Sequence, residues 1–168
     1  MSLIIEDGSG KSDAEAYISV TDASTYFTNR GNTSWDAIAT DALREAYLRQ
    51  STDYMTQMYR ARWEGMRYTE DQALDWPRLD VYRDRWPFPT DEVPIEVQNA
   101  CAELALKASS GELAPDLTQG VIREKVDVIE VEYDKSSPQY TRYRSIDAML
   151  SPYLSATSSG ACVGLIRT

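Results

Sequence analysis

The stretch at residues 41–59 constrains the fold more than any other, because its apolar residues recur at helical spacing. Intervals of three, four and seven positions predict an amphipathic helix with one buried face. Thr40 stands just before the stretch, where a threonine hydroxyl can cap the first turn. Since such a helix is stable only when its apolar face is covered, the pattern predicts a domain of packed helices. The predicted buried face consists of Leu43, Tyr47, Tyr54, Met55 and Met58.

Three other stretches carry helical signals. Residues 20–30 follow Ser19, and Asp22 stands three positions later, as in a capping box. A further helix begins near Pro94, because proline is tolerated in a first turn, and Ser145 can cap a short helix at residues 146–154. The sequence therefore predicts a mainly α protein, a small bundle of three to four helices. The predicted buried face of the helix after Pro94 is Val97, Ala100, Cys101, Leu104 and Ala108.

Residues 121–134 interrupt the helical pattern with a minor β element. Val126 and Val128 alternate with charged residues, and Ile129 and Val131 continue in the opposite phase. This change of phase predicts a strand with a bulge or a short hairpin. From residue 155 the chain is rich in Ser, Gly and Ala, which predicts a flexible C-terminal tail at 155–168 behind a single domain at 1–154.

Charge and composition argue against several classes of protein. The net charge of −10 disfavours nonspecific binding to phosphates. The apolar runs are short, so we expect no transmembrane helix and no signal peptide, but a soluble protein made in a cytoplasm. The chain has no His, and its two cysteines, Cys101 and Cys162, stand far apart. We therefore expect no catalytic residues, no metal site, no cofactor and no enzymatic activity.

The acidic N-terminal loop carries two weak signals for chemistry. Residues 10–12, Gly-Lys-Ser, resemble the end of a P-loop, but this chain has Ile5 where the motif needs glycine. A polar turn is the expectation there. Paired carboxylates such as Glu6 and Asp7 can act as acid and base only where their surroundings separate the two pKa values. In a polar loop we expect both to be solvated.

Residues 59–68 interleave arginines with aromatic residues, a combination that single-strand binders use to track phosphates and stack on bases. Between residues 60 and 86, however, six acids balance six arginines. Trp, Tyr and Arg are also enriched at protein interfaces, so two interpretations stay open. A nucleic-acid site would use Arg60, Arg62, Trp63, Arg67 and Tyr68. A protein core or subunit interface would use Arg62, Trp63, Trp76, Pro77, Arg78 and Trp86.

The order of these motifs resembles one protein family over nearly the whole chain. Its members are small tailed-phage and prophage proteins encoded near the capsid genes and labelled DnaT-like single-stranded DNA-binding proteins. Characterised relatives are head–tail adaptors, also called head-completion or connector proteins. The most specific parts are QALDWPR at 72–78 and the Arg62–Trp63 pair, and residues 121–144 match less distinctly. The other motifs are EDGSG, AEAYISVTDASTYFTNRGN, LRQSTDYM, RARWEGMR, VPIEVQNACAELAL and VGLIRT.

The resemblance implies a structural virion protein with a helical core and a small β element. Twelve copies would form a ring on the phage portal protein and bridge it to tail or nozzle proteins, at the head–tail junction of a virion assembled in the host cytoplasm. Genomic DNA would pass through the lumen without specific binding, and a negative wall suits that passage.

The resemblance also implies a role for the C-terminal tail. The end of the tail, with Leu165, Ile166 and Arg167, would dock into the portal, since a short apolar strand on a flexible tether can extend a neighbour's sheet. An ordinary frayed terminus is the alternative.

Overall fold

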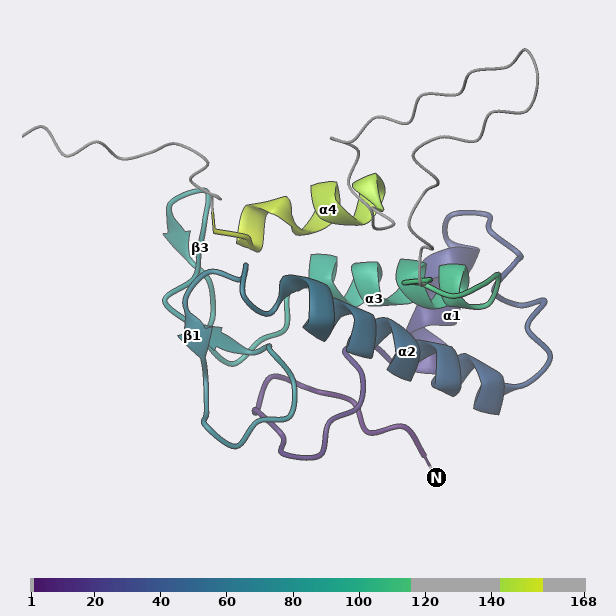
Figure 1. Cartoon of the computed structure of the whole chain (residues 1–168), viewed down its shortest axis with the longest axis horizontal. Helices are drawn as coiled ribbons and strands as arrows, with labels where there is room; N and C mark the ends of the chain where they lie inside the picture. Colours follow the sequence, from purple (N-terminus) through teal and green to yellow (C-terminus); the bar gives the residue numbers. More distant parts are fainter. Residues whose placement is uncertain (1, 116–142, 156–168) are drawn as a thin grey trace, which may run out of the picture.

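The computed structural model describes residues 2–115 and 143–155, and within them the chain is mainly α-helical (Figure 1). The prediction of a mainly α protein is confirmed, and the described residues also contain short strands at positions where none was predicted. The β element predicted at 121–134 and the tail from residue 156 onward lie outside the described residues. The described helices are α1 (Val20–Thr28), α2 (Asp41–Tyr59), α3 (Ile95–Ala108) and α4 (Arg144–Leu150), and a 3₁₀ turn at Ser151–Tyr153 follows α4.

The central helix is α3, which contacts both α2 and α4, while α1 packs against α2 and α3 (Figure 1). Its buried face is built from small residues, and Ala100, Cys101 and Ala105 have no exposed surface. Small side chains allow neighbouring backbones to approach closely. The hydroxyl of Ser51 on α2 accordingly lies 3.0 Å from Sγ of Cys101. The predicted buried face of this helix is confirmed.

The bounds of α2 are those predicted, and Thr40 caps it by accepting a hydrogen bond from the backbone N–H of Leu43 at 3.3 Å. The predicted face is only partly right, because Leu43 is 44% exposed. The helix is rotated so that Ser51 and Thr52 face the core. Their hydroxyls donate to the carbonyl oxygen of Leu48 at 2.8 and 2.9 Å, which satisfies them there. The buried residues of α2 are Leu48, Ser51, Thr52, Tyr54, Met55 and Tyr59.

The N-terminal loop is organised around a buried carboxylate. Glu6 is 3% exposed and accepts hydrogen bonds from the backbone N–H groups of Gly8 and Gly10 at 2.9 Å and of Lys11 at 2.8 Å. The prediction of a solvated carboxylate is therefore wrong at Glu6. Gly8 has a φ of 101°, and a side chain there would collide with the carbonyl oxygen of Asp91. The loop is thus packed against the backbone just before α3.

Two small antiparallel sheets lie in the connection between α2 and α3. Strand β1 (Met66–Arg67) pairs with β2 (Arg78–Leu79), and β3 (Tyr82–Arg83) pairs with β4 (Trp86–Pro87). Both lie at the end of the molecule where α2 ends and α3 begins (Figure 1). The connection contains three prolines, Pro77, Pro87 and Pro89, which disfavour regular helix, and the structure has none there.

Candidate interaction surface

Residues 60–93, here called the aromatic segment, fold back on a cluster of edge-to-face rings. The ring of Trp76 has no exposed surface, and its centroid lies 5.7 Å from that of Trp63, 5.9 Å from Phe88 and 5.5 Å from Tyr153. Such contacts are favourable beyond the area they bury. Tyr153 belongs to the 3₁₀ turn after α4, so the cluster ties the aromatic segment to the C-terminal part of the described chain.

Arg78 holds the aromatic segment together from inside. Its side chain is buried, and its guanidinium donates to the carbonyl oxygens of Glu64 at 2.6 Å, Gly65 at 2.7 Å and Asp75 at 3.1 Å. Burial lowers the pKa of Arg78. Because its donors are used by main-chain carbonyls, this arginine positions the loop and is closed to external phosphates.

Asp75 is the buried acid of the segment, with 1% of its surface exposed. One carboxylate oxygen accepts from Nε of Arg60 at 2.9 Å, and the backbone N–H of Asp75 donates to the hydroxyl of Tyr17 at 3.0 Å. Burial raises the pKa of Tyr17 above its usual range. These contacts tie the aromatic segment to both the N-terminal region and the end of α2.

The residues considered for nucleic-acid binding are mostly engaged within the fold. Arg60 pairs with Asp75, and Trp63 is 5% exposed. The guanidinium of Arg62 lies over the ring of Tyr59, 5.2 Å from its centroid, and 3.6 Å from a carboxylate oxygen of Asp147.

The last two members of that set lie on and just after β1. Arg67 donates to the carbonyl oxygen of Glu70, and Tyr68 is the one aromatic member with substantial exposure, at 40%. A single-stranded ligand would therefore find only one open ring among these five residues.

Of the residues considered for a core or a subunit interface, some are buried in the core and one is exposed at the surface. Trp63, Trp76, Pro77 and Arg78 are buried, whereas Trp86 is 77% exposed. The sequence could not separate them, because all stand among the same arginines, acids and prolines. Trp35 is also buried, so Trp86 is the one exposed tryptophan among the described residues.

The β3–β4 hairpin displays Trp86 on a rigid support. Its two turn residues, Asp84 and Arg85, have φ values of 52° and 72°, as in the turns that suit two-residue hairpins. Arg83 anchors the hairpin to α3 through an ion pair of 2.8 Å with Glu96. The turn lacks the Asn-Gly or Asp-Gly pair that signals such hairpins in a sequence, so only the spacing of Tyr82 to Pro87 could have suggested it.

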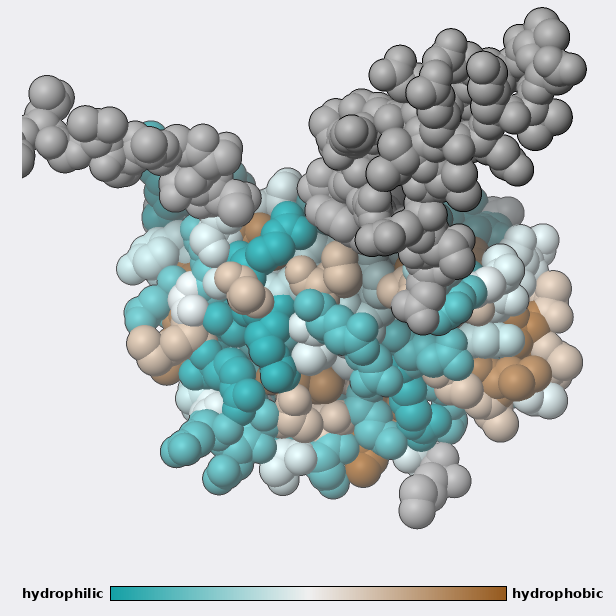
Figure 2. All heavy atoms as spheres, in the orientation of Figure 1, coloured by the Kyte–Doolittle hydropathy of each residue, from teal (hydrophilic) through white to brown (hydrophobic). Residues whose placement is uncertain are grey.

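Large hydrophobic residues that remain exposed occur mainly in the aromatic segment, and two of them, Tyr82 and Trp86, lie on this hairpin. Four of the seven in the described chain belong to the aromatic segment. On the face drawn in Figure 2 hydrophilic residues predominate, and hydrophobic ones gather mainly beside the α1–α2 loop and the start of α2. The seven are Ile4, Leu43, Met66, Tyr68, Tyr82, Trp86 and Ile95.

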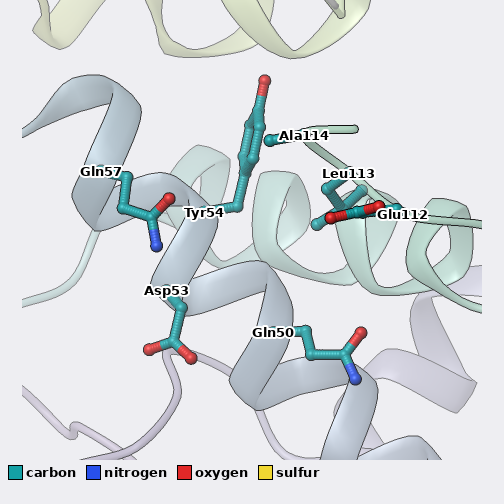
Figure 3. Close-up of a pocket in the computed structure, with 7 residues that line it drawn as sticks. All are labelled: Gln50, Asp53, Tyr54, Gln57, Glu112, Leu113 and Ala114. Atoms are coloured by element: carbon teal, nitrogen blue, oxygen red, sulfur yellow. The ribbon is translucent and has the colours of Figure 1, made fainter. Parts of the chain in front are cut away.

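A hollow of about 360 Å³ lies between α2 and the segment that follows α3 (Figure 3). Asp53 on α2 and Glu112 opposite it are both exposed acids, and partial burial raises the pKa of Asp53. The sequence did not indicate this site, because its two sides are more than fifty positions apart. The lining residues are Gln50, Asp53, Tyr54, Gln57, Glu112, Leu113 and Ala114.

The described residues contain no group of three or more side chains that could together hold a metal ion. No helix in them is long and apolar enough to cross a membrane. Cys101 lies in the core, where burial raises the pKa of its thiol.

One family model matches the whole chain, residues 1–168, and its description is "Putative DnaT-like ssDNA binding protein". The chain belongs to this DnaT-like family. No curated protein and no solved structure matches it. The match includes both the buried QALDWPR box and the exposed hairpin, so the DnaT-like family covers the core and the candidate interaction surface alike.

Proposed function

We propose that this DnaT-like protein is a structural virion protein, a head-to-tail adaptor that forms a ring on the portal and bridges it to the tail. The observation that carries the proposal is Trp86, 77% exposed on a hairpin that Arg83 anchors to α3 through its ion pair with Glu96. Exposed tryptophan and arginine on a rigid support are typical anchors of protein interfaces. The adaptor resemblance supplies the kind of partner.

The charge of the chain supports the same proposal. A protein with a net charge of −10 repels phosphates at long range. In an adaptor ring this repulsion would keep genomic DNA from adhering to the channel wall during its passage. The proposal thus uses the acidic composition, whereas a nonspecific DNA-binding function would have to overcome it.

Single-stranded DNA binding is the second candidate, and the description of the family favours it. Its residues would be Arg60, Arg62, Trp63, Arg67 and Tyr68. To bind DNA with this set, Trp63 would have to leave the ring cluster, whereas Arg60 is 52% exposed and pairs with Asp75 through Nε. Removing Trp63 from the cluster opposes binding, because opening a packed core is costly.

Co-sedimentation with portal rings from the same genome tests the first candidate. The adaptor should pellet with the rings, and free protein should stay in the supernatant. Failure to bind the rings, in both low and near-physiological salt, would rule the adaptor function out.

Fluorescence anisotropy of a labelled single-stranded oligonucleotide tests the second candidate. On our proposal no binding appears at near-physiological salt. Tight binding that weakens steeply with salt, and that is lost in Arg62→Ala, would establish the DNA function instead.

A further inference from the structure

An adaptor ring requires contacts between neighbouring copies, and two separate features of the described chain complement each other. We propose that Trp86 of one copy inserts into the hollow between α2 and the segment after α3 of the next copy, with Arg85 beside Asp53 and Glu112. The inference rests on the proposed ring and names the surfaces that would close it.

The projecting partner of this contact is the tip of the β3–β4 hairpin. Trp86 is 77% exposed, and Tyr82 beside it is 54% exposed. Arg85 is exposed and forms no ion pair with any described residue. The hairpin is held by Arg83 and Glu96, so little conformational entropy would be lost when it docks. An indole with an unpaired guanidinium next to it fits a hollow whose floor includes Tyr54, Leu113 and Ala114 and whose edge carries carboxylates.

The receiving partner is the hollow drawn in Figure 3. Its volume of about 360 Å³ is near the lower end of the range for binding pockets and can hold one indole ring. Tyr54 and Leu113 supply apolar surface, and Asp53 and Glu112 supply the charge. Neither carboxylate forms an ion pair within the described chain, and burial raises the pKa of Asp53. A carboxylate that is partly stripped of water gains from a neighbouring cation.

The hairpin and the Glu112 side of the hollow lie at opposite ends of α3, so Arg85 of one copy lies far from its own Glu112. The hairpin is tied to the first turn of α3 through Glu96, whereas Glu112 follows the other end of that helix. The 14 residues of α3 span about 20 Å at about 1.5 Å per residue. A contact between two different surfaces of identical chains is heterologous, and such contacts close into rings when the rotation allows. This is the symmetry that an adaptor ring requires.

Sedimentation velocity of the full chain over a concentration series tests the contact. Trp86→Ala should weaken self-association at least about 30-fold, as expected for removal of an interface anchor. Leu43→Ala is the matched control, because it removes another exposed apolar side chain, from the far end of α2. An equal effect of the two variants, or no self-association of the wild type at millimolar concentration, would overturn the proposal.

Charge reversal provides a second readout that misfolding cannot imitate. Arg85→Glu should weaken self-association. Adding Glu112→Lys to the same chain should restore the association affinity by at least about tenfold, since each contact between copies then regains a pair of opposite charges. A double variant as weak as Arg85→Glu alone would argue against the pairing.

Cross-linking decides which surfaces meet. In a Cys162→Ser background, copies with Asp84→Cys, which keep Trp86 and Arg85, are mixed with copies with Gln57→Cys and treated with a short bis-maleimide. Cross-links should form between the two kinds of copy. Cross-links only between two Asp84→Cys copies would show a two-fold contact and overturn the proposal. The adaptor function is judged separately, because portal co-sedimentation of the wild type does not depend on which surfaces join neighbouring copies.

Discussion

Replacing Glu6 by glutamine removes the charge around which the N-terminal loop is organised. The carboxylate is 3% exposed, and one of its oxygens accepts from Gly8 and Gly10 while the other accepts from Lys11. Glutamine has the same shape but only one acceptor oxygen. Its best orientation keeps that oxygen on the two glycines and turns the amide NH₂ toward the N–H of Lys11, donor against donor.

The loss of stability in Glu6→Gln can be worked out from these hydrogen bonds. A buried N–H left without an acceptor costs about 1–3 kcal/mol. The two bonds that remain lose their charge assistance, which adds about 1 kcal/mol. Glu6→Gln should therefore lower the free energy of unfolding by about 2–4 kcal/mol. With a urea dependence of about 2 kcal/mol/M for a protein of this size, the unfolding midpoint falls by about 1–2 M.

Equilibrium urea unfolding followed by circular dichroism measures this shift. Asp7→Asn is the matched control, because it makes the same change of charge in the same loop at an exposed position. Its midpoint should stay close to that of the wild type, since an exposed ion pair contributes little. Equal midpoints for Glu6→Gln and Asp7→Asn would refute the account of the loop as a structure built on a buried carboxylate.

Three further predictions follow from the core, the tail and the hollow. Trp76→Ala should lower the free energy of unfolding by about 3–5 kcal/mol in the same urea assay. The free energy of unfolding of Trp86→Ala should stay within about 0.5 kcal/mol of the wild-type value. Deletion of residues 164–168 should weaken co-sedimentation with portal rings and leave the thermal unfolding midpoint unchanged; unchanged co-sedimentation would contradict portal docking by the tail. Because burial raises the pKa of Asp53, its ionisation disfavours the folded state. Asp53→Asn should therefore raise stability at pH 7 and lose that advantage below the ordinary carboxyl pKa of 3.8.

The first three helices were predictable because their signals are local, whereas the cap predicted at Ser145 is wrong, because α4 begins at Arg144 without a side-chain cap. Thr40 sets the start of α2 through a bond to Leu43, three residues away, and the small residues around Cys101 mark the buried face of α3. The rotation of α2 was not predictable. Ser51 and Thr52 read as polar positions, and only the carbonyl oxygen of Leu48 on the same helix and the small face of α3 make their burial favourable.

The structure of the aromatic segment was harder to predict from the sequence, because it depends on contacts between residues that are distant in the sequence. Trp63, Trp76 and Trp86 stand in similar surroundings along the chain, yet they end at 5%, 0% and 77% exposure. Two contacts shape this segment. The buried guanidinium of Arg78 donates hydrogen bonds to three carbonyl groups of the segment. The ring of Tyr153, which follows α4 in the sequence, packs against the ring of Trp76. Residue types and spacing carry no information about either contact.

Tyr153 connects the two surfaces that the proposed adaptor would use. Its hydroxyl accepts from Arg83 at 3.2 Å and donates to Glu96 at 2.8 Å, which fixes the hairpin that carries Trp86. Its carbonyl oxygen accepts from the N–H of Glu64 at 3.0 Å, and the N–H of Ser155, the last described residue, donates to the carbonyl oxygen of Arg62 at 2.8 Å. The hairpin of the proposed neighbour contact and the residue that precedes the proposed portal-docking tail are therefore both bound at the same part of the chain.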